Sequence, residues 1–322
     1  EGRFDKDSVY DLHLMSAKPF IYVFNVDDSE LQNRELQDKL AASVAPAPAV
    51  FLNAQFEADL TELDEADARD EQHDFHFASV DQSRYTVMFF TDLHLTNSSE
   101  KRDLDHYRSI ALASISDEAA QASARGPVYS LNLGDLSHDL YWYQYDFDVS
   151  SAKRFLEQNG FPTLLYSIPG NHDNDGATPA GVGVDRRAEH LYRRTFGPTY
   201  YAMNIGDVHW IMMDNIIYKN TPGKGKKNVG VVGARDYDKG FTPEQLAWLR
   251  RDLVDASKPV CLCTHCPVFF DRDRRTLLTD RSQVDSLDAL FSRFERVHIF
   301  SGHAHRTLYT QDADYPRFDQ YV

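Results

Sequence analysis

The sequence predicts an α/β fold in which helices cover both faces of a sheet. Three observations lead to this class. From Tyr85 onward, short segments of strand composition alternate with segments of helical composition. Most of these strand segments are apolar throughout, as is typical of strands buried on both faces. Polar residues of a few types recur where the strands end, and ligands of α/β folds bind at the carboxyl ends of strands.

Residues 1–84 have a different pattern and are predicted to form a small β domain, which the sequence need not contain in full. Two segments, 19–26 (PFIYVFNV) and 74–80 (DFHFASV), are rich in the aromatic and β-branched residues of strands. The Pro/Ala-rich stretch at 41–50 between them is interpreted as a linker or loop. The second domain is predicted to span residues 85–322.

Strands and helices alternate in the first half of this second domain. Asn159-Gly160 and Gly197-Pro198 are helix stop signals. The predicted strands are 85–90, 128–133 and 163–168, and the predicted helices are 102–124, 150–158 and 185–196.

The second half begins with a predicted hairpin over 200–215, which turns at Gly206-Asp207. Thr242 begins the next helix as its N-cap, because Pro243 and Gln245 follow at the positions that such a start favours. The remaining predicted elements are the end of this helix near 256, a strand at 259–264, a helix at 284–294 and a strand at 297–300.

Asp, Asn or His follows directly after each of five predicted strands. We expect these side chains to converge on one edge of one sheet, since a recurrence at five equivalent positions is hard to explain by chance. The residues, strand by strand, are Asp92 and His94; Asp135; Asn171, His172 and Asp173; His265; and His303 and His305.

The residue types at these positions predict a site for two metal ions. Carboxylate, amide oxygen and imidazole together suit manganese, iron or zinc. The Asp-x-His and His-x-His spacings place alternate side chains on the same side of an extended segment. Glycines beside Asp135, Asn171 and His303 allow tight turns and close backbone approach. Two such ions lie ~3.5–4 Å apart, so one carboxylate can bridge them.

The five groups of residues that follow the strands, here called motif blocks, stand in an order that resembles the calcineurin-like metallophosphoesterases over about residues 85–305. The resemblance implies two β-sheets packed together with helices outside. The expected fold is therefore an α/β fold with a two-sheet β-sandwich core flanked by helices and preceded by the small β domain.

The resemblance also implies a role for each motif residue. Asp92, His94 and His305 would hold one ion, and Asp135 would bridge it to the other. His172 would not be a ligand but would lie beside the phosphate as general acid or as a stabiliser of the leaving oxygen. The second ion would be held by Asn171, His265 and His303.

The expected reaction is hydrolysis of a phosphate ester, either a phosphodiester or a phosphomonoester, of a small molecule, nucleotide or lipid headgroup. Two divalent or trivalent cations (manganese, iron or zinc) neutralise the anionic ester and lower the pKa of a shared water, so that a bridging hydroxide is available near neutral pH. Positioning and charge stabilisation would supply most of the rate.

Departures from the family's patterns narrow the resemblance. Gly134-Asp135 is not followed by the Arg-Gly of serine/threonine phosphatases, and His138 stands where purple acid phosphatases have Tyr. The remaining similarity is to a bacterial group with a β-sandwich domain in front and often a further C-terminal domain. That similarity implies export to the periplasm or cell surface, although the chain starts at Glu1 without a visible signal peptide.

Residues near the motif blocks are candidates for binding the substrate. His138 either lines the pocket or is exposed, and both interpretations stay open. Asp139 and Asn215 are further pocket candidates. Arg274 and Arg275 follow His265 and would hold a distal phosphate or carboxylate.

Net charge and composition limit the partners. The charge of -16 argues against nucleic acid as the routine partner, so a small phosphorylated substrate is expected. No apolar run approaches the ~18 residues of a membrane-spanning helix. Three cysteines, an odd number, make no disulfide framework. Two alternatives remain open, a secreted binding protein stabilised by its metal site and a DNA nuclease, while oligomeric state is not indicated.

Overall fold

The computed structural model of the chain divides into two compact units, Glu1–Glu71 and Gln72–Val322, and each is described by itself. The residues that the structure describes are 22–25, 33–45, 49–52, 84–96, 111–138, 147–163, 165–176, 178–221, 236–256, 258–270, 275–276 and 278–322.

The described part of the first unit consists of two parallel strands and a helix between them in sequence. Strands β1 (Tyr22–Asn25) and β2 (Ala49–Leu52) pair in register, and helix α2 (Arg34–Val44) is capped by the Asn33 side chain. The interpretation of 41–50 as linker or loop is wrong at both ends, because the last turn of α2 and the start of β2 lie there. The predicted strand at 74–80 lies outside the described residues, and the small β domain of 1–84 stays a prediction.

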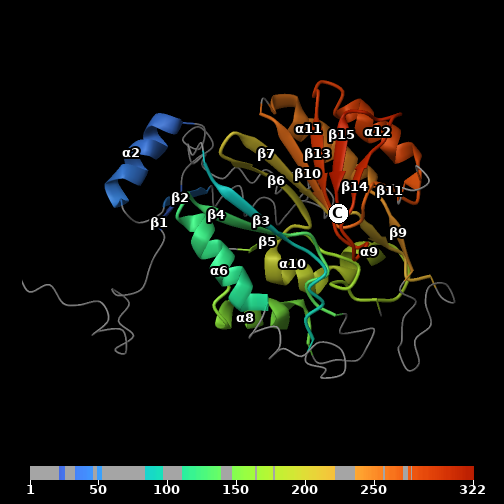
Figure 1. The fold of residues 1–322 in the computed structure, drawn as a ribbon, viewed down its shortest axis with the longest axis horizontal. Helices are drawn as coiled ribbons and strands as arrows, with labels where there is room; N and C mark the ends of the chain where they lie inside the picture. The colour runs from blue at the N-terminus through green and yellow to red at the C-terminus, as the bar shows by residue number, and fades with distance from the viewer. Residues whose placement is uncertain are drawn as a thin grey trace, which may run out of the picture. The chain divides into compact units, whose positions relative to one another are not determined.

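A three-stranded parallel sheet begins the second unit (Figure 1). Its strands lie in the order β3 (Thr86–Phe90), β4 (Val128–Asn132) and β5 (Leu165–Ser167). Apolar composition predicts all three. Because the strands are parallel, the loops that follow them all leave from the same edge.

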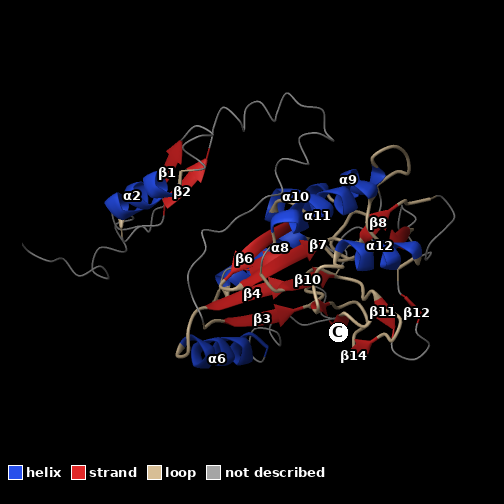
Figure 2. Cartoon of the chain, turned by 90° about the horizontal axis from the view of Figure 1, so that it is seen from above, coloured by secondary structure: helices blue, strands red, loops and turns tan. Residues whose placement is uncertain are grey.

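A six-stranded sheet forms the other half of the core, in the order β14-β15-β13-β10-β7-β6 (Figure 1). Figure 2 shows β6, β7 and β10 of this sheet from a second direction. The four inner strands β15, β13, β10 and β7 are parallel, while β6 and β14 pair antiparallel at the two edges. The strands are β6 (Tyr200–Ile205), β7 (Val208–Met213), β10 (Val260–Thr264), β13 (Val297–Phe300), β14 (Tyr309–Gln311) and β15 (Phe318–Tyr321).

Two short antiparallel pairs lie outside these sheets. They join β8 (Ile216–Tyr218) to β9 (Tyr237–Lys239) and β11 (Phe269–Phe270) to β12 (Arg275–Thr276). The sequence predicts neither pair, since strands this short have no periodicity of their own and form only through their partners.

Helices cover the outer faces of both sheets (Figure 1). Apolar residues of α6, α8 and α10 form a core cluster with Leu165 of β5 on the outer side of the three-stranded sheet. Residues of α11 and α12 pack with β7, β10 and β13 on the outer side of the six-stranded sheet. The helices are α6 (Leu112–Ser123), α8 (Val149–Gln158), α9 (Val184–Ala188), α10 (His190–Phe196), α11 (Pro243–Asp255) and α12 (Ser282–Leu290).

The predicted start of α11 is confirmed in atomic detail. Gln245 N donates to Thr242 Oγ1 at 3.2 Å, and Thr242 N donates to Gln245 Oε1 at 2.7 Å, which is a reciprocal capping box. The single helix predicted over 185–196 is instead α9 and α10. The helix is interrupted at Glu189, a buried residue whose carboxylate accepts from Arg193 Nε at 2.7 Å.

Strand alternation produces the core between the two sheets. In β7, Trp210 and Met212 face the three-stranded sheet, while Ile211 and Met213 face the outer helices. Cys261 and Cys263 of β10 lie in the inter-sheet cluster, buried and free. The fold is thus an α/β fold with a two-sheet sandwich core flanked by helices, as predicted.

Candidate metal centre

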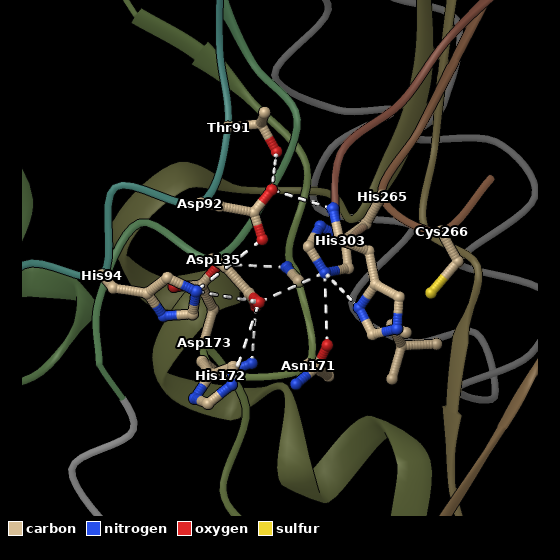
Figure 3. A network of polar contacts seen from close by, with 12 residues as sticks. Thr91, Asp92, His94, Asp135, Asn171, His172, Asp173, His265, Cys266 and His303 are labelled. Atoms are coloured by element: carbon tan, nitrogen blue, oxygen red, sulfur yellow. Dashed lines mark hydrogen bonds and ion pairs between the residues drawn. The ribbon is translucent and has the colours of Figure 1, made fainter. Parts of the chain in front are cut away.

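The polar residues at the five strand ends meet at one place, but they come from two sheets. The carboxyl ends of β3, β4 and β5 supply Asp92 to Asp173, and those of β10 and β13 supply His265 to His305. The expectation of one edge of one sheet was wrong, because strand composition does not say which strands pair. The site lies where the carboxyl edges of both sheets meet (Figure 3).

Hydrogen bonds between the loops tie the two sheet edges together. His265 Nδ1 lies 2.8 Å from the main-chain oxygen of Leu133 and donates to it. His303 N likewise donates to Asp92 Oδ2 at 2.8 Å, so here the six-stranded sheet orients a side chain of the three-stranded one, and Thr91 Oγ1 donates to the same oxygen at 2.7 Å. Each sheet therefore orients side chains that the other sheet contributes.

Two glycines permit this close approach. A Cβ on Gly170 would lie 2.2 Å from Asp135 Oδ1, and one on Gly302 would lie 1.7 Å from Thr91 Oγ1. Both distances are far below van der Waals contact, so only glycine fits at these positions.

Site residues adopt backbone conformations that are rare for residues with side chains. Of the six non-glycine residues with positive φ in the described part of the chain, five belong to the predicted ligand set. Left-handed backbone of this kind costs on the order of 1–3 kcal/mol per residue and clusters at functional sites. The five are Asp92 (54°), His94 (47°), Asp135 (55°), His303 (65°) and His305 (52°).

Asp92, His94 and His305 form a first group of converging donor atoms. His94 Nε2 lies 3.2 Å from His305 Nε2, and Asp92 Oδ1 lies 3.1 Å from His305 Nε2 and 3.7 Å from His94 Nε2. His94 is buried, whereas the His305 side chain is about half exposed. This side of the site is therefore open to solvent at His305.

Asn171, His265 and His303 form a second group. His265 Nε2 lies 3.2 Å from Asn171 Oδ1 and 3.3 Å from His303 Nδ1. The bond to Leu133 fixes a proton on His265 Nδ1, so Nε2 is the nitrogen that would face a bound ion.

Asp135 lies between the two groups. Its Oδ2 is 3.7 Å from His94 Nε2 in the first group and 3.3 Å from His265 Nε2 in the second. Its Oδ1 accepts a hydrogen bond from His172 N at 2.7 Å, which holds the carboxylate in this orientation. One fully buried carboxylate thus faces both groups.

Burial and neighbouring charges shift the pKa values at the site strongly. Burial opposes ionisation of Asp135, but His265 and His172 outweigh it and hold the Asp135 pKa well below its usual range. Burial likewise opposes ionisation of Asp92, yet His94 and His265 bring the Asp92 pKa to about 2. Burial lowers the pKa of His265, but Asp135 raises it more, to about 9. At Asp92 and Asp135 the neighbouring histidines thus favour the ionised carboxylate, which positive charge beside it stabilises.

The pKa of His303 moves in the opposite direction from that of its neighbour His265. Burial and the charge of His265 lower the pKa of His303 to about 3. A neutral His303 keeps a ring-nitrogen lone pair available as a ligand.

The donor set fits metal ions. Asp92 Oδ1 is buried, and ring nitrogens of His305 and His94 lie 3.1 and 3.7 Å from it. The ring nitrogens of two histidine pairs, His94 with His305 and His265 with His303, face each other at 3.2 and 3.3 Å. Mixed carboxylate, amide and imidazole donors suit manganese, iron or zinc.

His172 lies beside the bridging carboxylate rather than inside either group. Its Nε2 is 4.0 Å from Asp135 Oδ2, and its side chain retains some solvent exposure. The His172 imidazole therefore lies beside Asp135 and outside both donor groups.

Three residues support the site without belonging to the predicted ligand set; Asp173 was expected at the site from its place after a strand, whereas Thr91 and Tyr218 were not singled out. Asp173 accepts from Ser137 N and Gly170 N, each at 2.9 Å, and so ties the β4 and β5 loops together. Thr91 orients Asp92, and the Tyr218 hydroxyl donates to the Asn171 main-chain oxygen. Asp173 and Thr91 adjoin motif residues in sequence, but Tyr218 carries no such signal.

The structure places the predicted substrate-binding residues in different settings. His138 lies against His94, with their Nδ1 atoms 3.3 Å apart. Asn215 is fully buried, and its amide donates to Cys266 O at 2.8 Å and accepts from Cys266 N at 2.9 Å. We therefore interpret Asn215 as a support for the His265 loop rather than a pocket residue. Asp139 and Arg274 lie outside the described residues, and of Arg275 only the backbone in β12 is described.

The fold and the donor groups together are those of a two-sheet metal-dependent hydrolase. The family model of the calcineurin-like phosphoesterases matches residues 85–307, so the chain belongs to this family and is a hydrolase that acts on phosphoester bonds. The resemblance seen in the sequence motifs is thereby confirmed.

Two solved structures are similar to the chain. One is a dimetal phosphatase from Danio rerio, with 13% identity and a TM-score of 0.45 over 73% of this chain and 85% of that one. The other is described as a 5'-nucleotidase from Staphylococcus aureus in complex with alpha-ketoglutarate, with 12% identity and a TM-score of 0.42 over 73% of this chain and 47% of that one. No curated protein sequence matches the chain. Because both scores are low, the family assignment rests on the family model.

Among the described residues, none of the helices has the length and apolar character needed to cross a membrane.

Proposed function

We propose that the chain hydrolyses a phosphate ester of a small molecule with two metal ions held at the meeting edges of its sheets. The observation that carries the proposal is the position of Asp135 Oδ2, which faces His94 Nε2 at 3.7 Å and His265 Nε2 at 3.3 Å. A buried carboxylate shared by two imidazole groups is the arrangement that a bridged pair of cations requires.

The proposed ligands follow from the two groups. Asp92, His94 and His305 would hold one ion, and Asn171, His265 and His303 would hold the other, with Asp135 shared. Bound manganese, iron or zinc would supply positive charge to neutralise the phosphate oxygens and to lower the pKa of a water. The residues themselves keep their lone pairs directed inward, because hydrogen bonds at their far sides fix the rings and carboxylates.

His172 is proposed as the general acid. Its ring lies beside Asp135 and outside the ligand groups, so it can donate a proton to the oxygen of the departing group. Proton transfer of this kind contributes ~10²–10⁴-fold to rate. The hydrogen bond from its main-chain N to Asp135 also fixes the His172 backbone relative to the proposed ions.

The substrate class follows from charge and exposure. With a net charge of -16, the chain would repel a long polyanion, which disfavours the DNA nuclease alternative. The half-exposed His305 leaves the first group open to a small ester from solvent. The proposed substrates are phosphodiesters or phosphomonoesters of a small molecule, nucleotide or lipid headgroup.

The test is hydrolysis of a chromogenic bis-ester and a chromogenic monoester with added manganese, zinc or iron, before and after chelation. We expect turnover with one of the two esters, its loss on chelation and its return with the ion. The matched variant is His172→Ala, which should keep both ions by elemental analysis but lose ~10²–10⁴-fold in kcat. A His172→Ala protein as active as the parent would refute the assigned role.

A further inference from the structure

His94 uses both of its ring nitrogens. Its Nε2 faces the proposed ion site, 3.7 Å from Asp135 Oδ2 and 3.2 Å from His305 Nε2. Its Nδ1 points the other way, 3.3 Å from Nδ1 of His138. The buried His94 ring is thus held between the proposed ion and a second imidazole.

The backbone of His138 is fixed where the β3 and β4 loops meet. His138 N donates to Leu95 O at 3.0 Å, directly after the isolated bridge that pairs Leu95 with Ser137. Ser137 in turn donates its main-chain N–H to Asp173 at 2.9 Å. The His138 ring therefore starts from a fixed position on the same loop as Asp135.

The His138 ring also packs against His172. The two rings are stacked, with centroids 5.4 Å apart and planes 10° apart. His94 meets both of them edge-on, at 5.2 Å from His138 and 4.5 Å from His172. One half-buried side chain consequently contacts both a proposed metal ligand and the proposed general acid.

The contact between the two Nδ1 atoms determines the proton positions once an ion is assigned to His94. A ligating Nε2 must offer its lone pair, so the His94 proton lies on Nδ1. That N–H points at His138 Nδ1, which must then be the acceptor, and the His138 proton lies on Nε2. Metal-ligating histidines are usually oriented by such an acceptor, most often a carboxylate or a carbonyl.

We propose that His138 is a positioning residue that orients His94 for the first ion by accepting its Nδ1–H, and that it supports the His172 ring from the side. The inference rests on the proposed function and deepens it, because it assigns a residue that tunes one of the two ions. It also replaces the prediction that His138 contacts the substrate.

Two substitutions distinguish the hydrogen-bond acceptor of His138 from the packing of its ring against His172. Asn places an oxygen about where His has Nδ1, so His138→Asn keeps the acceptor and loses the stacked ring. His138→Phe keeps a ring against His172 and loses the acceptor. Manganese binding measured by calorimetry is the readout, with the melting temperature of each metal-free variant as the control for folding.

We expect His138→Phe to bind the first ion ~10–100-fold more weakly, which is the usual effect of losing such a partner. His138→Asn should bind it within a few-fold of the parent, and both variants should bind the second ion normally. Equal binding of both ions by His138→Phe and the parent would overturn the inference. An equal loss of first-ion binding in both variants would also overturn the inference, because His138→Asn keeps the acceptor and should bind nearly as well as the parent.

A second measurement needs no variant. In the zinc-loaded parent, long-range ¹H–¹⁵N correlation spectra should place the His138 proton on Nε2 and the His94 proton on Nδ1. A His138 proton on Nδ1 would overturn the inference while leaving the proposed hydrolysis intact. A parent protein that binds no ion and cleaves neither ester would overturn both.

Discussion

The ring of His265, at the end of a strand in the six-stranded sheet, donates its Nδ1–H to the main-chain oxygen of Leu133, 2.8 Å away after a strand of the other sheet. This bond fixes a proton on His265 Nδ1 and directs its Nε2 toward Asn171, 3.2 Å away. A metal ligand of one sheet is therefore oriented by the backbone of the other, and the site depends on the packing of both.

The first prediction concerns the number of ions bound. His265→Ala should lose one of the two ions, because the first group of ligands, Asp92, His94 and His305, remains complete. Asp135→Ala should lose both, because Asp135 faces both groups. Elemental analysis after dialysis against manganese measures the ratio of ion to protein. Equal ion content in the two variants would contradict the assignment of Asp135 as the bridge.

Removal of the ions should lower thermal stability. Each ion that binds only the folded chain stabilises it by about 2.7 kcal/mol when its free concentration is about 100 times Kd. For a unit of this size each ion therefore raises Tm by roughly 5–10 °C. Differential scanning calorimetry with chelator and with added manganese measures the shift. Asp135→Ala is the matched control, and it should show no rise on adding manganese.

Glycine at position 302 should be required for the site rather than for the fold at large. A Cβ there would lie 1.7 Å from Thr91 Oγ1 and 2.6 Å from Asp92 Oδ2, so Gly302→Ala must displace a proposed ligand. A displacement of about 1 Å can cost ~10²-fold in rate. We expect kcat to fall by at least this factor, as measured with the ester that the parent cleaves.

Gly160→Ala is the control for this substitution. Gly160 has a φ of +78°, and a Cβ at this position would meet no atom of the surrounding structure within 4 Å, so alanine there strains the backbone without a collision. It should lower stability by about 1 kcal/mol and leave kcat unchanged. Comparable losses of kcat in the two alanine variants would show that the close contact at Gly302 is not the cause.

Stability should depend on pH through Asp214. Burial raises the pKa of this carboxyl well above its usual range, and the nearby Glu189 and Asp185 raise it further. The folded state therefore holds this proton more tightly than the unfolded state. The stabilisation is complete below the unfolded pKa and is lost as pH rises toward the folded value. Asp214→Asn should leave stability at pH 4 nearly unchanged and raise it relative to the parent at pH 8.

Asp148 is the control, because its pKa is shifted in the opposite direction from that of Asp214. Burial opposes its ionisation, but hydrogen bonds from Ser150 and Ser151 outweigh burial and lower the Asp148 pKa. Its contribution is present above the unfolded pKa and is lost as pH falls. Asp148→Asn should therefore lower the free energy of unfolding at pH 8. Urea unfolding of each variant at pH 4 and pH 8 measures these changes. An Asp214→Asn protein less stable than the parent at pH 8 would contradict the prediction.

Much of the fold could be predicted from local sequence. The strand at 297–300 is indicated by its apolar composition and the helix start at Thr242 by its capping residues, and both occur where expected. By contrast, β15 was not predicted, because its buried residues include Asp319 and Gln320. Gln320 is accommodated only because its amide binds the main chain of Val268 and Phe269, which lie far away in sequence.

The amino-acid sequence by itself determined which residue types follow the strands, and this was enough to predict two metal ions and the family. It could not determine that the strands divide between two sheets, since apolar strands of similar composition can pair in many orders. Only the tertiary structure placed Asp135 between His94 and His265, turned His138 against His94, and directed Asn215 to the Cys266 backbone. The physical reason is that side-chain direction at these loops depends on left-handed backbone and on hydrogen bonds between distant segments, neither of which is encoded in a local pattern.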